Sequence, residues 1–250
     1  MLHKRIIFLL TLPLLLTSIC IFSFTTLGTL EGDAHVSTTH TVCASGCDFM
    51  SIQAAIDAAG SGDTISLAGE IFTEPFTVDK SLTIEGDGAE NTILQAAESQ
   101  ALSTSRVITV TEGVTATITG VTIRYGTESG SFPRGYGGGI FSQGTLTISY
   151  STVFSNTAGA GGGIYSNAAL VIIHCIVDSN TSEYSGGGIY NGDFNVSDAP
   201  QLTLLYSIIS NNKAYSASEG GGGLRNSDNI ATISNTSFLN NYAYTGGGGL

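Results

Sequence analysis

The sequence predicts an all-β fold, a right-handed parallel β-helix in which the short strands of successive coils stack into a solenoid. The first observation is a glycine run followed by Ile or Leu, which returns several times in the second half of the 250-residue chain. The second is an asparagine that keeps a constant distance from two apolar residues before it. The third is a series of short segments that alternate as β-strands do.

The glycine runs set the period of the repeat. The apolar residues that follow them are spaced by 24, 25, 35 and 26 residues, and they are Ile140, Ile164, Ile189, Leu224 and Leu250. A period near 25 made of short β-rich segments fits one coil of a solenoid, with strands of neighbouring coils about 4.8 Å apart. Because glycine has no Cβ, a column of glycines lets the chain turn with positive φ and pack closely at a corner.

Asparagine marks another corner of the same repeat. An apolar residue is followed five residues later by a second one, and three residues after that by asparagine. The aligned sets are Ile148, Val153 and Asn156; Ile172, Val177 and Asn180; Leu204, Ile209 and Asn212; and Ile233, Phe238 and Asn241, with Ile118, Ile123 and Gly126 as an earlier degenerate copy. Because asparagine tolerates left-handed backbone and its amide can bond along a stack, we expect an asparagine ladder.

The N-terminal half has strand-like segments with a weaker repeat, at 64–67, 82–86, 91–94, 106–110 and 116–123. The segment SIQAAIDAAG differs, because its apolar residues fall on one helical face: Ile52, Ala55, Ile56 and Ala59. Ser51 is a suitable N-cap and Gly60 a suitable stop. Since a solenoid has an open apolar end, we expect a short helix over 51–59 as its N-terminal cap. The chain stops inside a coil, so we expect an uncapped C-terminal end and an incomplete β-helix.

A basic start at 3–5 followed by a long apolar run predicts export. We favour a cleaved signal peptide, and an uncleaved membrane anchor is the alternative. The expected organisation is therefore a signal peptide or anchor over 1–34, a cap over 35–60, and a parallel β-helix over 61–250. The net charge of −12 with only 8 basic residues excludes a nucleic-acid binder, which would need a basic stripe. Membrane contact is expected only through the N-terminal segment.

Two cysteines lie just beyond that segment. Cys43 and Cys47 are close in sequence, and an exported protein meets an oxidising environment, so we expect them to form a disulfide. No cluster of cysteine or histidine suggests a metal site near them. Cys175 stands alone in a strand-like segment and is expected to be a buried small apolar residue.

The segment from CASGCDF to ENTIL resembles the opening of right-handed parallel β-helix proteins with the pectin-lyase-like fold. The phrases GGGI, VFSN, IVDSN and FLNN resemble the paired GGA-I and F-x-x-N repeats of the polymorphic outer-membrane adhesin family, although the runs here are GGG. The resemblance covers 40–250. It implies the fold more than the function, because this fold hosts lyases, hydrolases, esterases and adhesins.

The polar residues give little sign of a catalytic site. The phrases typical of pectate lyases and polygalacturonases are absent, and Asp178 and Asp228 each stand alone where glycosidase chemistry needs paired carboxylates. His174 has no acidic partner in sequence, so we expect a stacked surface residue or a core residue instead of a base. We therefore expect no catalytic residue, no cofactor and no metal ligand.

These observations favour a secreted or cell-surface, non-catalytic, adhesin-like binding solenoid that contacts a polysaccharide or cell-surface glycan. Its candidate contact strip is an exposed column of rings formed by Phe141, Tyr165 and Tyr190, each one residue after an inward-facing isoleucine. One alternative is a polysaccharide lyase or glycoside hydrolase of the pectin-lyase-like fold whose site is missing or degenerate. Another is a structural stalk. The sequence does not indicate an oligomeric state.

Overall fold

The computed structural model describes residues 36–130, 135–192, 201–216, 220–227 and 230–249. The expected signal peptide or anchor over 1–34, as well as Asp228 and Leu250, lie outside these ranges. Within them, no helix is both long enough and apolar enough to cross a membrane.

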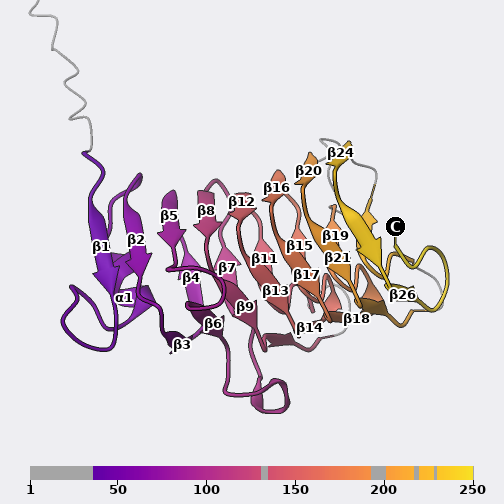
Figure 1. The fold of residues 1–250 in the computed structure, drawn as a ribbon, viewed down its shortest axis with the longest axis horizontal. Coiled ribbons are helices and arrows are strands. Elements are labelled where there is room, and N and C mark those ends of the chain that lie inside the picture. Colours follow the sequence, from indigo (N-terminus) through magenta and orange to yellow (C-terminus); the bar gives the residue numbers. More distant parts are fainter. Residues whose placement is uncertain (1–35, 131–134, 193–200, 217–219, 228–229, 250) are drawn as a thin grey trace, which may run out of the picture. The chain divides into compact units, whose positions relative to one another are not determined.

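The described chain is a right-handed parallel β-helix, as predicted, and its successive coils add strands to four parallel sheets (Figure 1). The longest sheet has eight strands: β1 (Thr39–Val42), β2 (Thr64–Leu67), β5 (Leu82–Glu85), β8 (Thr115–Thr119), β12 (Thr145–Ser149), β16 (Leu170–Ile173), β20 (Leu202–Leu205) and β24 (Ala231–Ser234). A seven-stranded sheet follows it around the coil: β3 (Ile71–Thr73), β6 (Ile93–Gln95), β9 (Thr122–Arg124), β13 (Thr152–Phe154), β17 (Ile176–Asp178), β21 (Ile208–Ser210) and β25 (Ser237–Leu239).

Two further sheets close the coil. One has five strands: β10 (Thr127–Glu128), β14 (Thr157–Ala160), β18 (Thr181–Ser185), β22 (Lys213–Ala214) and β26 (Tyr242–Ala243). The other has six: β4 (Phe76–Val78), β7 (Ile108–Val110), β11 (Ile140–Ser142), β15 (Ile164–Ser166), β19 (Ile189–Asn191) and β23 (Leu224–Asn226). A 3-10 turn, η1 (Gln100–Leu102), lies between β6 and β7. Every strand pair in these sheets is parallel, and each strand is short because a corner follows within a few residues.

The register predicted from the repeats is confirmed. Ile140 pairs with Ile164, Ile164 with Ile189, and Ile189 with Leu224. The other apolar positions align in the same way, from Ile118 through Ile148 to Ile233 and from Ile123 through Val153 to Phe238. These columns point inward, and most of their side chains are fully buried. Stacking identical or similar apolar residues therefore builds one continuous core from coils that are individually too small to have one.

The glycine corners have the close packing that the sequence predicts. Gly161 has φ +61°, in the left-handed region that glycine adopts without strain. A Cβ on the next residue, Gly162, would overlap the carbonyl oxygen of Thr181 in the following coil. The chain therefore needs glycine here for two separate reasons, the backbone conformation and the close approach of the next coil.

The asparagine ladder is present, and it packs against the glycine column: a Cβ on Gly163 would lie 3.0 Å from Cγ of Asn180. Asn180 is fully buried, and its side-chain oxygen accepts hydrogen bonds of 3.0 Å from both the backbone nitrogen and Nδ2 of Asn156. Its own Nδ2 donates to the backbone oxygen of Val153 at 3.0 Å and to Oδ1 of Asn212 at 3.0 Å. Asn212 repeats the pattern with Asn241. The ladder thus satisfies buried backbone groups and joins consecutive coils.

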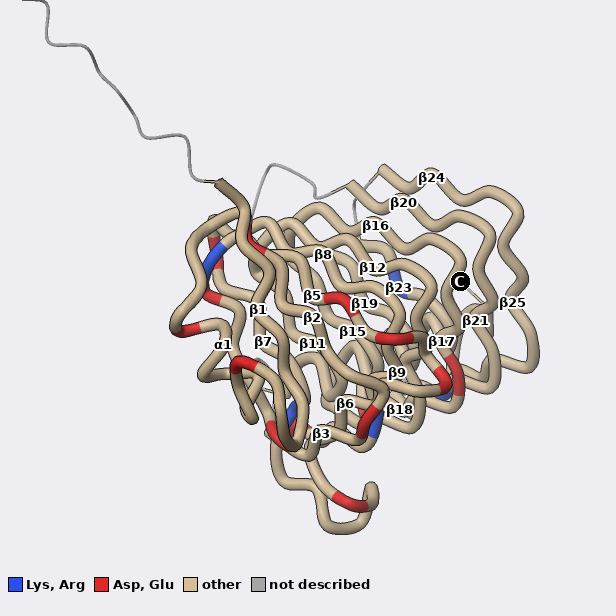
Figure 2. Tube along the Cα trace, turned by 60° about the vertical axis from the view of Figure 1, so that its left-hand side comes forward, with Lys and Arg blue, Asp and Glu red and all other residues tan. Residues whose placement is uncertain are grey.

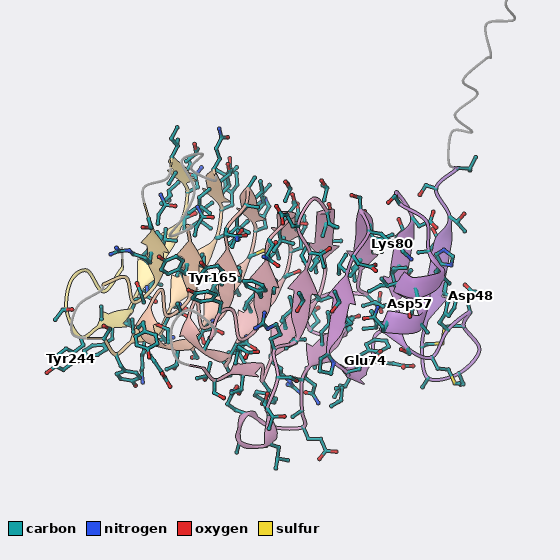
Figure 3. All side chains as sticks on the ribbon, turned by 180° about the vertical axis from the view of Figure 1, so that it is seen from behind. Asp48, Asp57, Glu74, Lys80, Tyr165 and Tyr244 are labelled. Atoms are coloured by element: carbon teal, nitrogen blue, oxygen red, sulfur yellow. A yellow bond between two sulfur atoms is a disulfide. The ribbon has the colours of Figure 1, made fainter. Side chains whose placement is uncertain are left out.

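The predicted capping helix is confirmed as α1 (Ile52–Ala58), which covers the first coils with Ile52, Ala55 and Ile56 buried. Ser51 caps it by accepting from the amide of Ala54. Two charged side chains hold its ends (Figure 3). Glu74 accepts from Ser51 Oγ and the amide of Ile52, and Lys80 Nζ donates to the carbonyl oxygens of three last-turn residues, Ile56, Asp57 and Ala59. Both charges have the sign that the helix dipole favours.

The cysteine predictions also agree with the structure. Cys43 and Cys47 form a disulfide that closes the loop after β1. Cys175 is free and buried, and burial raises the pKa of its thiol to about 11. It therefore serves as a small core residue and carries no thiolate at neutral pH.

We predict that Asn180→Ala lowers the free energy of unfolding by about 3 kcal/mol, because it leaves the buried amide of Asn156 without its acceptor and removes the bonds to Val153 and Asn212. Urea denaturation measures the change. The control is Glu183→Ala in the same coil, where the side chain is exposed and the expected change is within about 0.5 kcal/mol. Equal urea midpoints for the two variants would contradict the role of the ladder.

Candidate functional site

The predicted ring column of Phe141, Tyr165 and Tyr190 exists, but the expectation that it is exposed is wrong. The Phe141 and Tyr165 rings are 5.7 Å apart, and those of Tyr165 and Tyr190 are stacked at 5.1 Å with planes 10° apart. Tyr165 is only 2% exposed and Tyr190 only 1%, while Phe141 is half-buried. Two of the three rings are therefore unable to form a surface strip for carbohydrate.

The segment before β11 covers the ring of Tyr165. Tyr136 in this segment places its ring 4.2 Å from that of Tyr165, with planes 16° apart, and pairs through its backbone with Ala160. Tyr136, Ala160 and the ring column form a second apolar cluster outside the main core. Strand alternation correctly turns the rings away from the main core, but Tyr136 covers the ring of Tyr165.

A different column of rings is exposed. Tyr150, His174 and Tyr206 occupy the same corner of consecutive coils, between the eight-stranded and seven-stranded sheets. Their rings stack at 5.0 Å with planes 12° and 11° apart. Tyr150 is 63% exposed and Tyr206 is 54% exposed. The expectation of a stacked His174 is confirmed, and we call these three residues the ring ladder.

The three residues of the ring ladder hold a strained, left-handed backbone conformation. They have φ of 48°, 53° and 50°, whereas neighbouring coils place Gly120 and Asn235 at this position. Left-handed backbone costs such residues roughly 1–2 kcal/mol each. Two ring stacks contribute about 0.5–1.5 kcal/mol each, which at best balances the strain. Because the rings add nothing to the core, stability alone gives little reason for them.

A charged column lies at the other edge of the seven-stranded sheet. The last residues of β6, β9, β13, β17 and β21 align in register: Gln95, Arg124, Phe154, Asp178 and Ser210. They point away from the core, and Phe154 separates Arg124 from Asp178 by two coil spacings, about 9.6 Å between backbones. We call Arg124, Phe154 and Asp178 the charged strip.

Arg124 is held in place while part of it stays available. Its Nε donates to Oε1 of Gln95 at 2.9 Å, and its guanidinium lies 4.7 Å from the centre of the Tyr125 ring. Gln95 is buried and is itself fixed by donating to Thr73 at 2.9 Å. The terminal nitrogens of Arg124 donate to no group in the described part of the chain. They are thus free to donate to a carbonyl or carboxylate oxygen of a ligand.

Asp178 is a half-buried carboxylate that accepts three hydrogen bonds. Oδ1 accepts from Ser210 Oγ at 2.6 Å and Asn211 Nδ2 at 2.7 Å, and Oδ2 accepts from Ser179 Oγ at 2.7 Å. Burial raises the pKa of Asp178, but the three donors together lower it by more, so the net shift is downward. Asp178 is therefore ionised at neutral pH.

The charged strip fits some reactions better than others. An ionised carboxylate can act as a nucleophile, and a guanidinium can stabilise negative charge on a carbonyl oxygen. The register neighbours of Asp178 are Phe154 and Ser210, so the strip lacks the second carboxylate that glycoside hydrolysis needs. In the described ranges no three His, Cys, Asp or Glu side chains gather in a way that could hold a metal ion.

Sequence reasoning treated Asp178 as isolated and missed its partners. The available signal was the repeat itself, because Arg124, Phe154 and Asp178 each directly follow the second apolar residue of their coil. Because the coils stack in register, residues at that shared position become neighbours on one face of the sheet.

The chain is similar to solved structures of pectin methylesterases. The enzyme from Erwinia chrysanthemi is 14% identical with a TM-score of 0.49, and the match covers 84% of this chain and 82% of that one. The carrot enzyme is 13% identical with a TM-score of 0.46, and the match covers 84% of both chains. Another similar structure, 14% identical with a TM-score of 0.42 over 84% of this chain and 82% of that one, is a pectin methylesterase variant in complex with a hexasaccharide. These similarities concern the pectin-lyase-like fold.

No protein-family model matches the chain, and no curated protein matches it either. The prediction of a non-catalytic, adhesin-like binding solenoid is corrected here, because the solved structures that match are carbohydrate esterases. The resemblance to polymorphic outer-membrane adhesins is not shown by these matches.

We predict that Asp178→Asn lowers stability by about 1 kcal/mol at pH 7, a small effect because the carboxylate is partly solvated. Its folded pKa is lowered, so its contribution is present above the unfolded pKa of about 3.9 and is lost as pH falls through the folded value. The difference in urea midpoint between the two proteins should therefore hold down to about pH 4 and shrink as the pH falls further, while Glu183→Gln changes little at either pH. If the difference in urea midpoint between wild type and Asp178→Asn grew at acidic pH, the lowered pKa of Asp178 would be refuted.

Proposed function

We propose that this protein is an exported enzyme that acts on a polysaccharide, hydrolysing ester groups at the charged strip. The observation that carries the proposal is the placement of an anchored Arg124 and an ionised Asp178 on either side of Phe154. An aromatic side chain flanked by polar groups suits a sugar ring, which has apolar C–H faces and a hydroxyl rim. The guanidinium suits the carboxyl-derived oxygens of an esterified sugar acid.

In the proposed reaction, a carboxylate oxygen of Asp178 adds to the ester carbonyl carbon, and Arg124 stabilises the charge that develops on the carbonyl oxygen. The alcohol leaves with a proton from water. The hydroxide left from that water then hydrolyses the mixed anhydride, which frees the acid and restores the Asp178 carboxylate. The low pKa of Asp178 suits a nucleophile better than a general base, which would need a pKa nearer neutrality.

Export is part of the same proposal. The disulfide between Cys43 and Cys47 supports an oxidising compartment, in keeping with the apolar N-terminal run. We accordingly propose residues 1–34 as the signal peptide or anchor, 35–60 as the cap and 61–250 as the β-helix.

The test uses methyl-esterified pectin, the polysaccharide named by the similar structures, with methanol release as the main readout. We expect the wild-type protein to release methanol, Asp178→Asn to lose at least about a hundredfold in kcat, and Arg124→Met to raise KM. Lys213→Met, at an exposed position on β22, is the control and should retain full activity.

Reducing ends and unsaturated ends are measured in the same samples. Their appearance without methanol would replace the esterase proposal by hydrolase or lyase activity. No turnover of any kind by the wild-type protein would overturn the proposal.

A further inference from the structure

We propose a second ligand site, at which the outer ring face of Tyr150 stacks on a neutral sugar unit of a polysaccharide. Tyr150 is the first ring of the ring ladder, and one face of it is covered by His174. On its other side the same corner is occupied by Gly120 and, one coil further, Gly86. Neither carries a side chain, and Tyr150 has no other ring contact in the described ranges.

Gly120 also shapes this side of the ring. Its φ is +67°, and a Cβ there would lie 2.8 Å from the carbonyl oxygen of Gly86. The corner before Tyr150 therefore excludes any side chain that would cover the ring. The outer face of the Tyr150 ring is therefore uncovered because the two preceding coils have glycine, Gly120 and Gly86, at the same corner.

A row of polar side chains leads along the outside of the eight-stranded sheet to this ring. Its members pair in register from β1 to β12: Thr41, Ser66, Glu85, Thr119 and Ser149. Ser149, directly before Tyr150, donates to Thr119 through its hydroxyl at 3.0 Å. Together with the ring face, this polar row offers hydroxyl and carboxylate partners for a ligand rich in hydroxyl groups.

The start of the polar row is hollowed. A hollow of about 480 Å³ is lined by Thr41, Ser66 and Glu85 of the row, together with Cys47, Gly86 and Asp87 among others. This volume lies in the range of ligand pockets. It opens beside the disulfide loop, two rungs of the sheet away from Ser149, so that one extended ligand can occupy the hollow and reach the ring.

The charges favour an uncharged occupant. Glu85 and Asp87 are exposed carboxylates on the approach to the ring, and they accept hydrogen bonds from sugar hydroxyls but repel a uronate. From β12 onward the described residues contain two acidic side chains, Asp178 and Glu183, and strands β20, β24 and β25 are uncharged (Figure 2). A neutral sugar chain meets both the apolar ring and the acidic row without a charge conflict.

The strain of the ring ladder agrees with a binding role. Tyr150, His174 and Tyr206 hold left-handed backbone where glycine or asparagine would be easier, and they do so on the surface. This site lies at the opposite edge of the seven-stranded sheet from the charged strip. It requires no turnover, so it stands or falls separately from the proposed esterase activity.

The test is native electrophoresis in gels that contain dextran, arabinogalactan, hydroxyethylcellulose or polygalacturonate. We expect at least one neutral polysaccharide to retard the wild-type protein. Any retardation by polygalacturonate, whose carboxylates Arg124 can bind, should be unchanged in Tyr150→Asn. Tyr150→Asn should raise the Kd about tenfold, the loss of one ring contact, whereas Tyr150→Phe keeps the ring and the binding.

Tyr206→Asn is the matched control, because it removes an equally exposed ring at the far end of the ring ladder. Both asparagine variants copy Asn235, which holds the same corner at φ 51°, so both should fold. Tyr206→Asn should bind within about twofold of wild type, since its loss leaves the Tyr150 face intact. No retardation by any neutral polysaccharide, or equal loss in the two asparagine variants, would overturn the proposal.

Discussion

Hydrogen bonding between equivalent residues of successive coils is the interaction on which the rest of this structure depends. A single coil has too few apolar residues for a core of its own, and its inward side chains are buried only when the next coil stacks on it in register. A slip of one residue would turn threonines inward and isoleucines outward. The asparagine ladder opposes such a slip, because each amide bonds both to the next amide and to a backbone carbonyl such as that of Val153.

The same register organises the surface into columns, so that chemistry is determined by which residues recur at one position of the coil. The charged strip combines Arg124 and Asp178 because both end their strands at the same position. The ring ladder stacks because three coils place a ring at one corner, and it stops where Gly120 takes that corner. A function can therefore change by substitution within a column without any change of fold.

Much of the fold could be predicted because residues that recur at the same position of the repeat are the ones that stack in successive coils. The register of Ile140, Ile164 and Ile189, the asparagine ladder and the capping helix all follow from spacing and from the needs of corners and solenoid ends. The burial of Tyr165 and Tyr190 could not be predicted in this way. The burial of Tyr165 depends on a non-periodic segment that brings Tyr136 against its ring, and the repeat contains no information about the path of that segment.

The candidate sites were harder to predict than the fold for a related reason. The alignment of Arg124, Phe154 and Asp178 is visible in the repeat, but the anchoring of Arg124 by Gln95 requires the weakly repeating N-terminal coils to be placed as well. The hollow beside Glu85 depends on the disulfide loop, which belongs to no repeat. A site that forms where repeated and non-repeated segments meet cannot be located from the repeat alone and is found only in the structure.

Amide hydrogen exchange measured by NMR tests most directly whether the asparagine ladder holds the coils together. The amides of Asn156, Asn180 and Asn212 each donate to the side-chain oxygen of the next asparagine, in fully buried positions. We expect them to exchange among the slowest in the protein, at rates set by global unfolding. Exchange as fast as that of Ser45 and Gly46, in the exposed disulfide loop, would contradict the account.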